Sequence, residues 1–170
     1  MSDYRKLSAQ DGSWEALKAE WHGQCSSYGE DFDSYAQGTF SVLTPLAENS
    51  EPDAGVYAYL DGGKHAAIFQ ANCTPLPGYT GPVLRVRFMT LAPQYDFGDF
   101  GVDQYSDVLA GVFATSMALS DIDMKSQHLK FHLQSPADRQ FFAMLEGPLG
   151  RTGIFESVQI RGAWLYITKK

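Results

Sequence analysis

Apolar residues recur at helical spacing in three segments of the chain. The first predicts a helix over residues 13–22, capped by Asp11 or Ser13. The second predicts a helix over residues 105–119. Its apolar stripe consists of Tyr105, Val108, Leu109, Val112, Phe113 and Met117.

A third helix has a clear start in the sequence. Ser135 is a capping residue, Pro136 occupies the first helical position, and Asp138 supplies an acid in the first turn. We expect this helix to run to about residue 145 or 146, before the glycine and proline that follow.

Alternating or short apolar runs predict the strands. Residues 56–60 and 66–71 flank an Asp-Gly-Gly turn, which is typical of an antiparallel hairpin. Residues 83–91 are rich in strand-forming side chains, and residues 128–133 alternate between polar and apolar. Residues 4–9 favour a first strand. Residues 155–167 favour a last strand or a bent pair, with Gly162 as a bulge.

Three stretches lack a regular pattern. A short second helix is predicted within residues 23–34, ending before Gly38. Residues 44–53, with two prolines, are predicted to form a loop, and residues 94–104 an irregular connection into the next helix. Together these elements predict a mixed α/β (α+β) fold, a central sheet flanked by helices. At 170 residues we expect a single domain, 1–170.

Charge narrows the classes of partner. The chain carries 20 acidic and 13 basic residues, a formal net charge of −7, which argues against nucleic acid and anionic membranes as partners. Cationic or neutral small partners fit this charge better. No stretch has about 18 uninterrupted apolar residues, and residues 1–11 lack a secretory pattern, so we expect a cytoplasmic protein. Cys25 and Cys73 have no metal-ligand spacing and are expected to be free thiols.

The order of these elements resembles the GNAT (GCN5-related N-acetyltransferase) superfamily over almost the whole chain. The local similarity is greatest in the final third, in SPADRQFFAMLEGPLGRTGIFESV and the following RGAWLYI. The resemblance implies acetyl-CoA or another acyl-CoA as cofactor. It also implies a fourth strand that diverges from the fifth and a helix N-terminus that receives the pyrophosphate.

Carried onto this chain, the resemblance implies a cofactor site at the end of strand 83–91 and in the loop after it. The implied residues are Met89, Thr90, Leu91, Gln94, Gly98 and Gly101. The loop departs from the family's pattern, because an acid stands where the family has a basic or amide residue. Its four aspartates are Asp96, Asp99, Asp103 and Asp107. They would repel phosphates, or they serve as solvated turn and capping residues; metal binding by them is a weaker reading, and we expect no metal site.

The catalytic residues are left open by the sequence. Phe142 stands where many GNAT enzymes have a tyrosine acid. Tyr105, Tyr95 and Tyr166 are candidate substitutes, or packing aromatics. His128 and His132 are candidate bases, or solvent-facing strand residues. Arg85 and Arg87 are either an anion site or ordinary surface charges.

Two functions follow from this reading. The first is a GNAT-like acyltransferase that moves an acyl group from acyl-CoA to an unidentified small-molecule or peptide amine. The alternative is a catalytically inactive protein of the same fold that serves as a binding or assembly module. By analogy with the family, a homodimer is expected through the apolar segment 163–167.

Overall fold

The computed structural model describes residues 3–170, so the first two residues of the segment 1–11 lie outside it. Seven strands and five helices make up this part of the chain. In chain order they are β1 (Tyr4–Leu7), α1 (Ser13–Ser27), α2 (Phe32–Glu48), β2 (Ala54–Asp61), β3 (Lys64–Pro75), β4 (Pro82–Leu91), α3 (Pro93–Phe97), α4 (Val102–Asp121), β5 (His128–His132), α5 (Pro136–Arg151), β6 (Phe155–Arg161) and β7 (Trp164–Lys169).

The strands form one mixed sheet in the order β1-β2-β3-β4-β5-β7-β6. All neighbouring strands are antiparallel except β4 and β5, which are parallel because α4 crosses between them. The predicted hairpin joins β2 and β3, with Gly62 and Gly63 at φ values of 57° and 81°. Positive φ at both central residues is what a two-residue turn of this hand requires.

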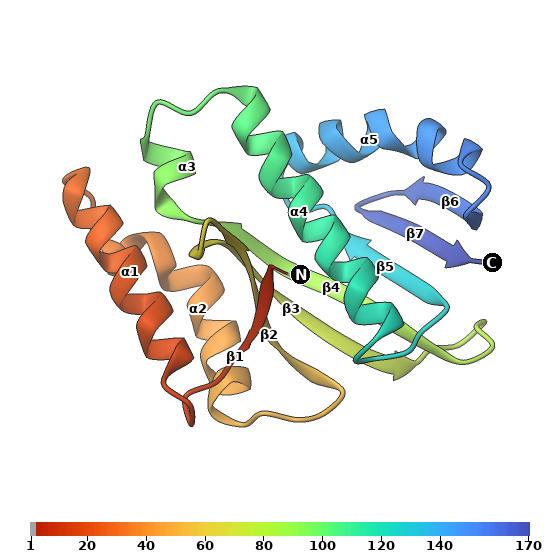
Figure 1. Cartoon of the computed structure of the whole chain (residues 1–170), viewed down its shortest axis with the longest axis horizontal. Coiled ribbons are helices and arrows are strands. Elements are labelled where there is room, and N and C mark those ends of the chain that lie inside the picture. Colours follow the sequence, from red (N-terminus) through yellow and green to blue (C-terminus); the bar gives the residue numbers. More distant parts are fainter. Residues whose placement is uncertain (1–2) are drawn as a thin grey trace.

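Helices cover the sheet on two faces (Figure 1). Each face has its own apolar core. On one face α1 and α2 pack against β1–β3, with Trp14, Trp21 and Leu43 fully buried. On the other face α4 and α5 pack against the centre and the C-terminal half, with Leu109 and Phe142 fully buried. The mixed α/β class with flanking helices, predicted from the sequence, is therefore confirmed.

The start of α5 also agrees with its prediction. The Ser135 hydroxyl accepts a hydrogen bond from the Asp138 N–H at 3.1 Å, and the Asp138 carboxylate accepts one from the Ser135 N–H at 3.1 Å. This reciprocal capping satisfies two N–H groups that a helix start otherwise leaves unpaired.

Helix ends were predicted less well, because glycine and proline were read as breaks. The helix α1 continues to Ser27, and α2 runs through Gly38 and Pro45, so the predicted short helix and the loop 44–53 are wrong in extent. Likewise α5 continues through Pro148 to Arg151. Both prolines stand near the C-terminal end of their helix, where a missing N–H costs one hydrogen bond in an already fraying turn.

Two further predictions require correction. The connection 94–104 is not irregular throughout, because α3 occupies its first half and α4 begins at Val102. Of the two forms expected for residues 155–167, the bent pair is confirmed, but Gly162 (φ 60°) lies in the turn between β6 and β7 and is not a bulge. Since β7 lies between β5 and β6, its backbone is already paired on both sides. The backbone of residues 163–167 is therefore not available for strand pairing with a second copy, and the homodimer stays a prediction.

Among residues 3–170, no helix combines the length and the apolar character needed to cross a membrane.

Candidate active site

The parallel strands β4 and β5 separate halfway along their length. Their pairing covers Val83–Val86 against His128–Phe131 and goes no further. Phe88 then adopts φ 55°, where β4 bulges against β3. On the other side, the Leu133 N–H donates to the Ala163 carbonyl oxygen at 2.8 Å and so follows the β7 side. A wedge opens between the two strand ends, as the resemblance implied for a cofactor site.

A polar cavity of about 280 Å³ lies at this wedge, and we call it the strand-end cavity. Three of its lining residues are the predicted strand-end residues Met89, Thr90 and Leu91. The others come from α2, α3, α4 and the start of α5: Tyr35, Thr39, Asp96, Tyr105, Gln134, Ser135 and Asp138. The structure thus brings the β4 residues together with side chains distant in sequence.

Tyr35 is a member of this cavity that the sequence did not indicate. Its hydroxyl donates to the Leu91 carbonyl oxygen at 2.5 Å and lies 3.0 Å from Asp96 Oδ2. Burial, together with the Asp96 carboxylate, raises the pKa of Tyr35 above its usual value. Burial also raises the pKa of Asp96. One backbone acceptor at the end of β4 is therefore already used by the chain itself.

Tyr105 and Asp138 form the opposite wall. Asp138 is 2% exposed, and its Oδ1 accepts a hydrogen bond from the Tyr105 hydroxyl at 3.2 Å. Burial and the nearby Asp138 charge raise the pKa of Tyr105 to about 12. Tyr105 consequently keeps its proton at neutral pH. Sequence reasoning gave Asp138 only a capping role, and only the fold adds the tyrosine contact.

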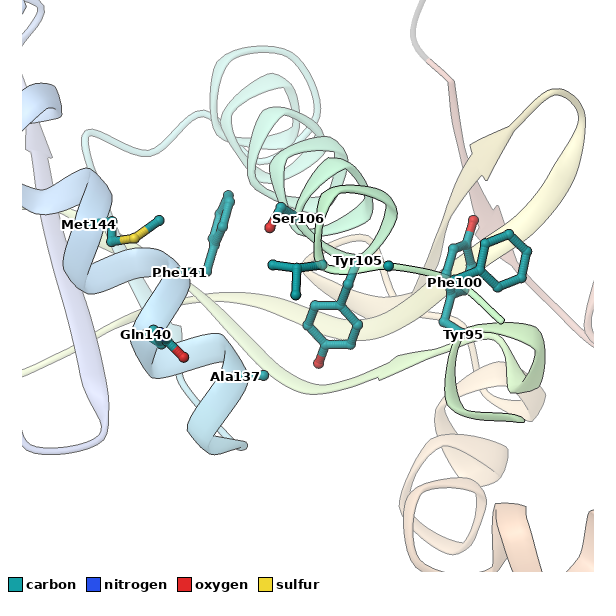
Figure 2. Close-up of a pocket in the computed structure, with 10 residues that line it drawn as sticks. Tyr95, Phe100, Tyr105, Ser106, Ala137, Gln140, Phe141 and Met144 are labelled. Atoms are coloured by element: carbon teal, nitrogen blue, oxygen red, sulfur yellow. The ribbon is translucent and has the colours of Figure 1, made fainter. Parts of the chain in front are cut away.

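A second cavity, of about 410 Å³, lies between the N-terminal ends of α4 and α5, and we call it the α4/α5 cleft. Figure 2 shows Tyr105 directed into the space between these helices, with Tyr95 and Phe100 on the α3 side. Apolar side chains dominate it, including the exposed Val102 and Met144. Since Tyr105 lines both, the cleft and the strand-end cavity adjoin.

The predicted loop residues divide between the cavity walls and the packing of α3. Gly101 lines the α4/α5 cleft, at the residue before α4. Gln94 lines neither cavity, and its N–H donates to Gln24 Oε1 at 3.1 Å. A Cβ at Gly98 would lie 2.5 Å from the Gln94 carbonyl oxygen and 2.9 Å from the Tyr28 hydroxyl. Gly98 therefore permits close packing at the end of α3. Unlike Gly101 and the strand-end residues, it lines neither cavity.

The acids of this loop are also separated. Asp96 lines the strand-end cavity, and Asp103 lies in the first turn of α4. All four aspartates, including Asp99 and Asp107, are exposed. Within residues 3–170 no group of three or more metal-ligating side chains comes together.

A third cavity, of about 290 Å³, lies on the sheet face turned away from α4 and α5, and we call it the open-face cavity. It is lined by Arg87, Phe88, His132, Gln134 and Trp164. His132 belongs to this face because it alternates along β5 with Phe131, which is in the α4/α5 core. Gln134 also lines the strand-end cavity, so the two cavities adjoin at the end of β5.

His132 is half-buried at this position. Its ring lies 4.8 Å from the Trp164 ring, between centroids. Burial, then the positive charges of Arg139 and Arg87, lower the pKa of His132 below 6.5. A neutral imidazole is therefore present at pH 7, and it is able to accept a proton.

The remaining candidate residues lie away from the wedge. Phe142 is fully buried, 4.9 Å from Phe131 between ring centroids. Tyr166 lies beneath Lys130 and Arg161 on β7. His128 is buried near the opposite end of β5, with Nδ1 at 3.0 Å from the Thr168 hydroxyl.

Comparison with known proteins gives similarities of structure only. No protein-family model matches the chain, and no curated protein shows significant similarity to it. A predicted acetyltransferase from Clostridium acetobutylicum, solved with acetyl-CoA, is 13% identical with a TM-score of 0.43, covering 85% of this chain and 88% of that chain. The GNAT domain of S. lividans PAT is 13% identical with a TM-score of 0.46, covering 96% and 87%.

An aminoglycoside acetyltransferase from an uncultured soil metagenomic sample is 13% identical, with a TM-score of 0.46 and coverage of 94% of this chain and 95% of that chain. These TM-scores are low, so the description of the fold rests on the strand order of this chain and not on the similarities. The strands β4 and β5 are parallel and diverge after Val86 and Phe131, which is the feature that the resemblance to the GNAT superfamily implied for the fourth and fifth strands.

Proposed function

We propose that this chain is a GNAT-like N-acyltransferase, which moves an acyl group from acyl-CoA to an amine. The observation that carries the proposal is the divergence of β4 and β5 after Val86 and Phe131. It leaves cavities of about 280 and 290 Å³ that adjoin through Gln134. Two reactants could thus approach one point from two adjoining cavities, which is what a bimolecular transfer requires.

The residues at the end of β4 fit the extended arm of acyl-CoA that carries the acyl group. Beyond Val86, β4 has no partner strand on the β5 side, so backbone groups near Met89 and Thr90 are available to an extended ligand. The α4/α5 cleft beside them is large enough for further parts of the ligand. At the first turn of α4, N–H groups favour a pyrophosphate, while the Asp103 carboxylate opposes it.

When bound, acyl-CoA would supply an activated thioester. The roles of the protein follow from the two groups beside the wedge. His132 is neutral and would accept the proton that the attacking amine loses. Tyr105 is protonated, and its hydrogen bond to the buried Asp138 positions the ring before reaction. It would give its proton to the departing thiolate, and the phenolate would then recover a proton through solvent, balanced by the one that His132 takes from the amine. These assignments give the catalytic roles that the sequence left open.

Calorimetric titration of the purified protein with acetyl-CoA, and with free CoA, tests the proposal at low and at physiological salt. Micromolar binding that persists in salt is expected if backbone groups dominate, because exposed charges alone would be screened. Absence of heat at millimolar ligand would contradict the proposal.

A binding or assembly module without activity is the second candidate. It is supported by the Leu91 carbonyl, which Tyr35 already occupies, and by Asp103 at the start of α4. It is also supported by Phe142, which lies in the core and offers no proton. Acetyl-CoA hydrolysis and transfer to a panel of amines separate the two functions, since the module would show neither.

A further inference from the structure

The open-face cavity contains an arginine without a counter-ion. The Arg87 Nε is buried, and no residue described by the structure accepts its hydrogen bond. Within residues 3–170, no carboxylate lies within 4.0 Å of its guanidinium group, and none of the ion pairs in this part of the chain includes Arg87. A buried donor that lacks an acceptor is costly, so an exogenous acceptor would relieve a real energetic deficit.

The charges around Arg87 are also positive. Arg85 lies two residues away on β4, and the pKa of Arg87 is lowered by burial and by Arg85. Lys130 on β5 and Arg161 on β6 cover the rings of β7 on this same face. None of the four forms an ion pair with a residue in the described part of the chain. Although the net charge is −7, this face attracts anions.

The walls and size of the cavity limit what it can hold. About 290 Å³ suits a small molecule, near the lower limit for ligand pockets. Phe88 and Trp164 supply apolar surface, and His132 and Gln134 supply polar groups. A guanidinium group matches a carboxylate or a phosphate through two parallel hydrogen bonds.

We propose that Arg87 binds the oxyanion of the acyl acceptor, which is a small amine carrying a carboxylate or a phosphate group. This inference deepens the proposed function, and the ligand's role as acyl acceptor rests on that proposal. Binding of the oxyanion at Arg87 directs the amine of such a ligand toward His132 and Gln134, and Gln134 also lines the strand-end cavity. The negative net charge of the whole chain predicts a cationic or neutral ligand instead, because it averages over both faces of the sheet.

Trp164 provides a direct probe of this cavity. The chain has three tryptophans, and Trp14 and Trp21 are fully buried in the α1/α2 core. In ¹H–¹⁵N spectra the indole signal of Trp164 is expected to shift with ligand, while the other two indole signals serve as internal controls. The probes are L-phenylalanine, L-phenylalaninamide, O-phosphoethanolamine and inorganic phosphate.

The amide retains the amine and the aromatic ring but lacks the carboxylate. L-Phenylalanine is therefore expected to bind at least about tenfold more tightly than its amide. O-Phosphoethanolamine binding more tightly than L-phenylalanine supports the proposal and identifies the oxyanion as a phosphate. Inorganic phosphate binding as tightly as either amine would mean an adventitious ion only, and would overturn it.

Variants test whether Arg87 is the residue responsible. Arg87→Gln is expected to weaken the charged amines about tenfold or more, and Arg87→Lys less, because lysine keeps the charge without the planar fork. Arg161→Gln is the matched control, since Arg161 is exposed on the same face outside the cavity. Equal losses in Arg87→Gln and Arg161→Gln would overturn the assignment. The comparison of acid with amide needs no variant and stands if Arg87→Gln does not fold.

Acetyl-CoA titration separates this inference from the proposed function. Preference for the acid without acetyl-CoA binding would leave an anion site but overturn its role toward an acyl acceptor. Acetyl-CoA binding without preference for the acid would overturn the inference and leave the acyltransferase proposal intact.

Discussion

The two halves of the sheet are buried differently, and the difference explains where a site can form. In the N-terminal half, β3 is buried continuously over residues 66–71, because helices cover both faces. In the C-terminal half, β5 and β7 bury one face against α4 and α5 and leave the other open. The face without a helix carries Lys130, which is half-buried over the Trp164 ring and forms no ion pair. It also carries Arg87, whose buried Nε lacks an acceptor at a cost in free energy. The candidate site lies at the boundary, where β4 and β5 part.

The largest effect is expected from emptying the covered face. Phe142→Ala should lower the free energy of unfolding by about 3–5 kcal/mol, because the ring is fully buried against Phe131 and the cavity is only partly refilled. Urea denaturation measures this. Arg161→Ala on the open face is the control and should change stability by about 0.5 kcal/mol or less. Comparable losses would contradict the contrast between the two faces.

A smaller loss is expected when the family's tyrosine is restored. Phe142→Tyr buries a hydroxyl among apolar rings and should cost about 1–3 kcal/mol. It should bring no gain in acyl transfer, because position 142 does not line the strand-end cavity. Denaturation and a transfer assay with acetyl-CoA check both parts. A gain in activity without loss of stability would show that this position reaches the reacting groups.

A third prediction concerns the Leu91 carbonyl oxygen at the wedge, which accepts the hydrogen bond of the Tyr35 hydroxyl. Tyr35→Phe removes the hydroxyl from the Leu91 carbonyl oxygen, so acetyl-CoA affinity should rise about threefold to tenfold by calorimetry. Tyr79→Phe serves as control, because Tyr79 lies beside His128, away from the wedge. Weaker binding by Tyr35→Phe would mean that Tyr35 contacts the ligand and does not compete with it.

The smallest effect concerns pH at the open face. The pKa of His132 is lowered from 6.5 in the folded chain, so the unfolded chain binds this proton more tightly. Stability should therefore fall as pH drops through about 6.5, and the fall should end below the folded pKa. His132→Gln should reduce the loss between about pH 7.5 and 5.5, measured by urea denaturation. An unchanged pH profile, with His22→Gln as control, would contradict the assigned shift.

Local patterns made much of the fold predictable. The Asp-Gly-Gly turn, the alternation in β5 and the capping sequence of α5 act within a few residues, so they could be read without knowing the neighbours. The errors at α2 and α5 have the opposite origin. Tertiary packing holds these helices through Gly38, Pro45 and Pro148, and local propensity is too weak to prevent it.

The site was predictable only in its β4 part. Met89, Thr90 and Leu91 were implied by the family resemblance and line the strand-end cavity, but Tyr35 joins them across 56 residues of sequence separation from Leu91. Nothing local marks Tyr35, because its role depends on how α2 lies over the sheet.

By itself, the sequence determined the mixed α/β class, most of the strands and the helices α1, α4 and α5, because these depend on periodicity and on turn and capping chemistry. Only the tertiary structure decided which groups face one another: Tyr35 on the Leu91 carbonyl, Tyr105 on Asp138, and Arg87, whose Nε has no acceptor, in one cavity with His132. The physical reason is that burial and pairing arise from contacts between distant segments. Whether a side chain is satisfied, shifted in pKa or left available to a ligand depends on those contacts.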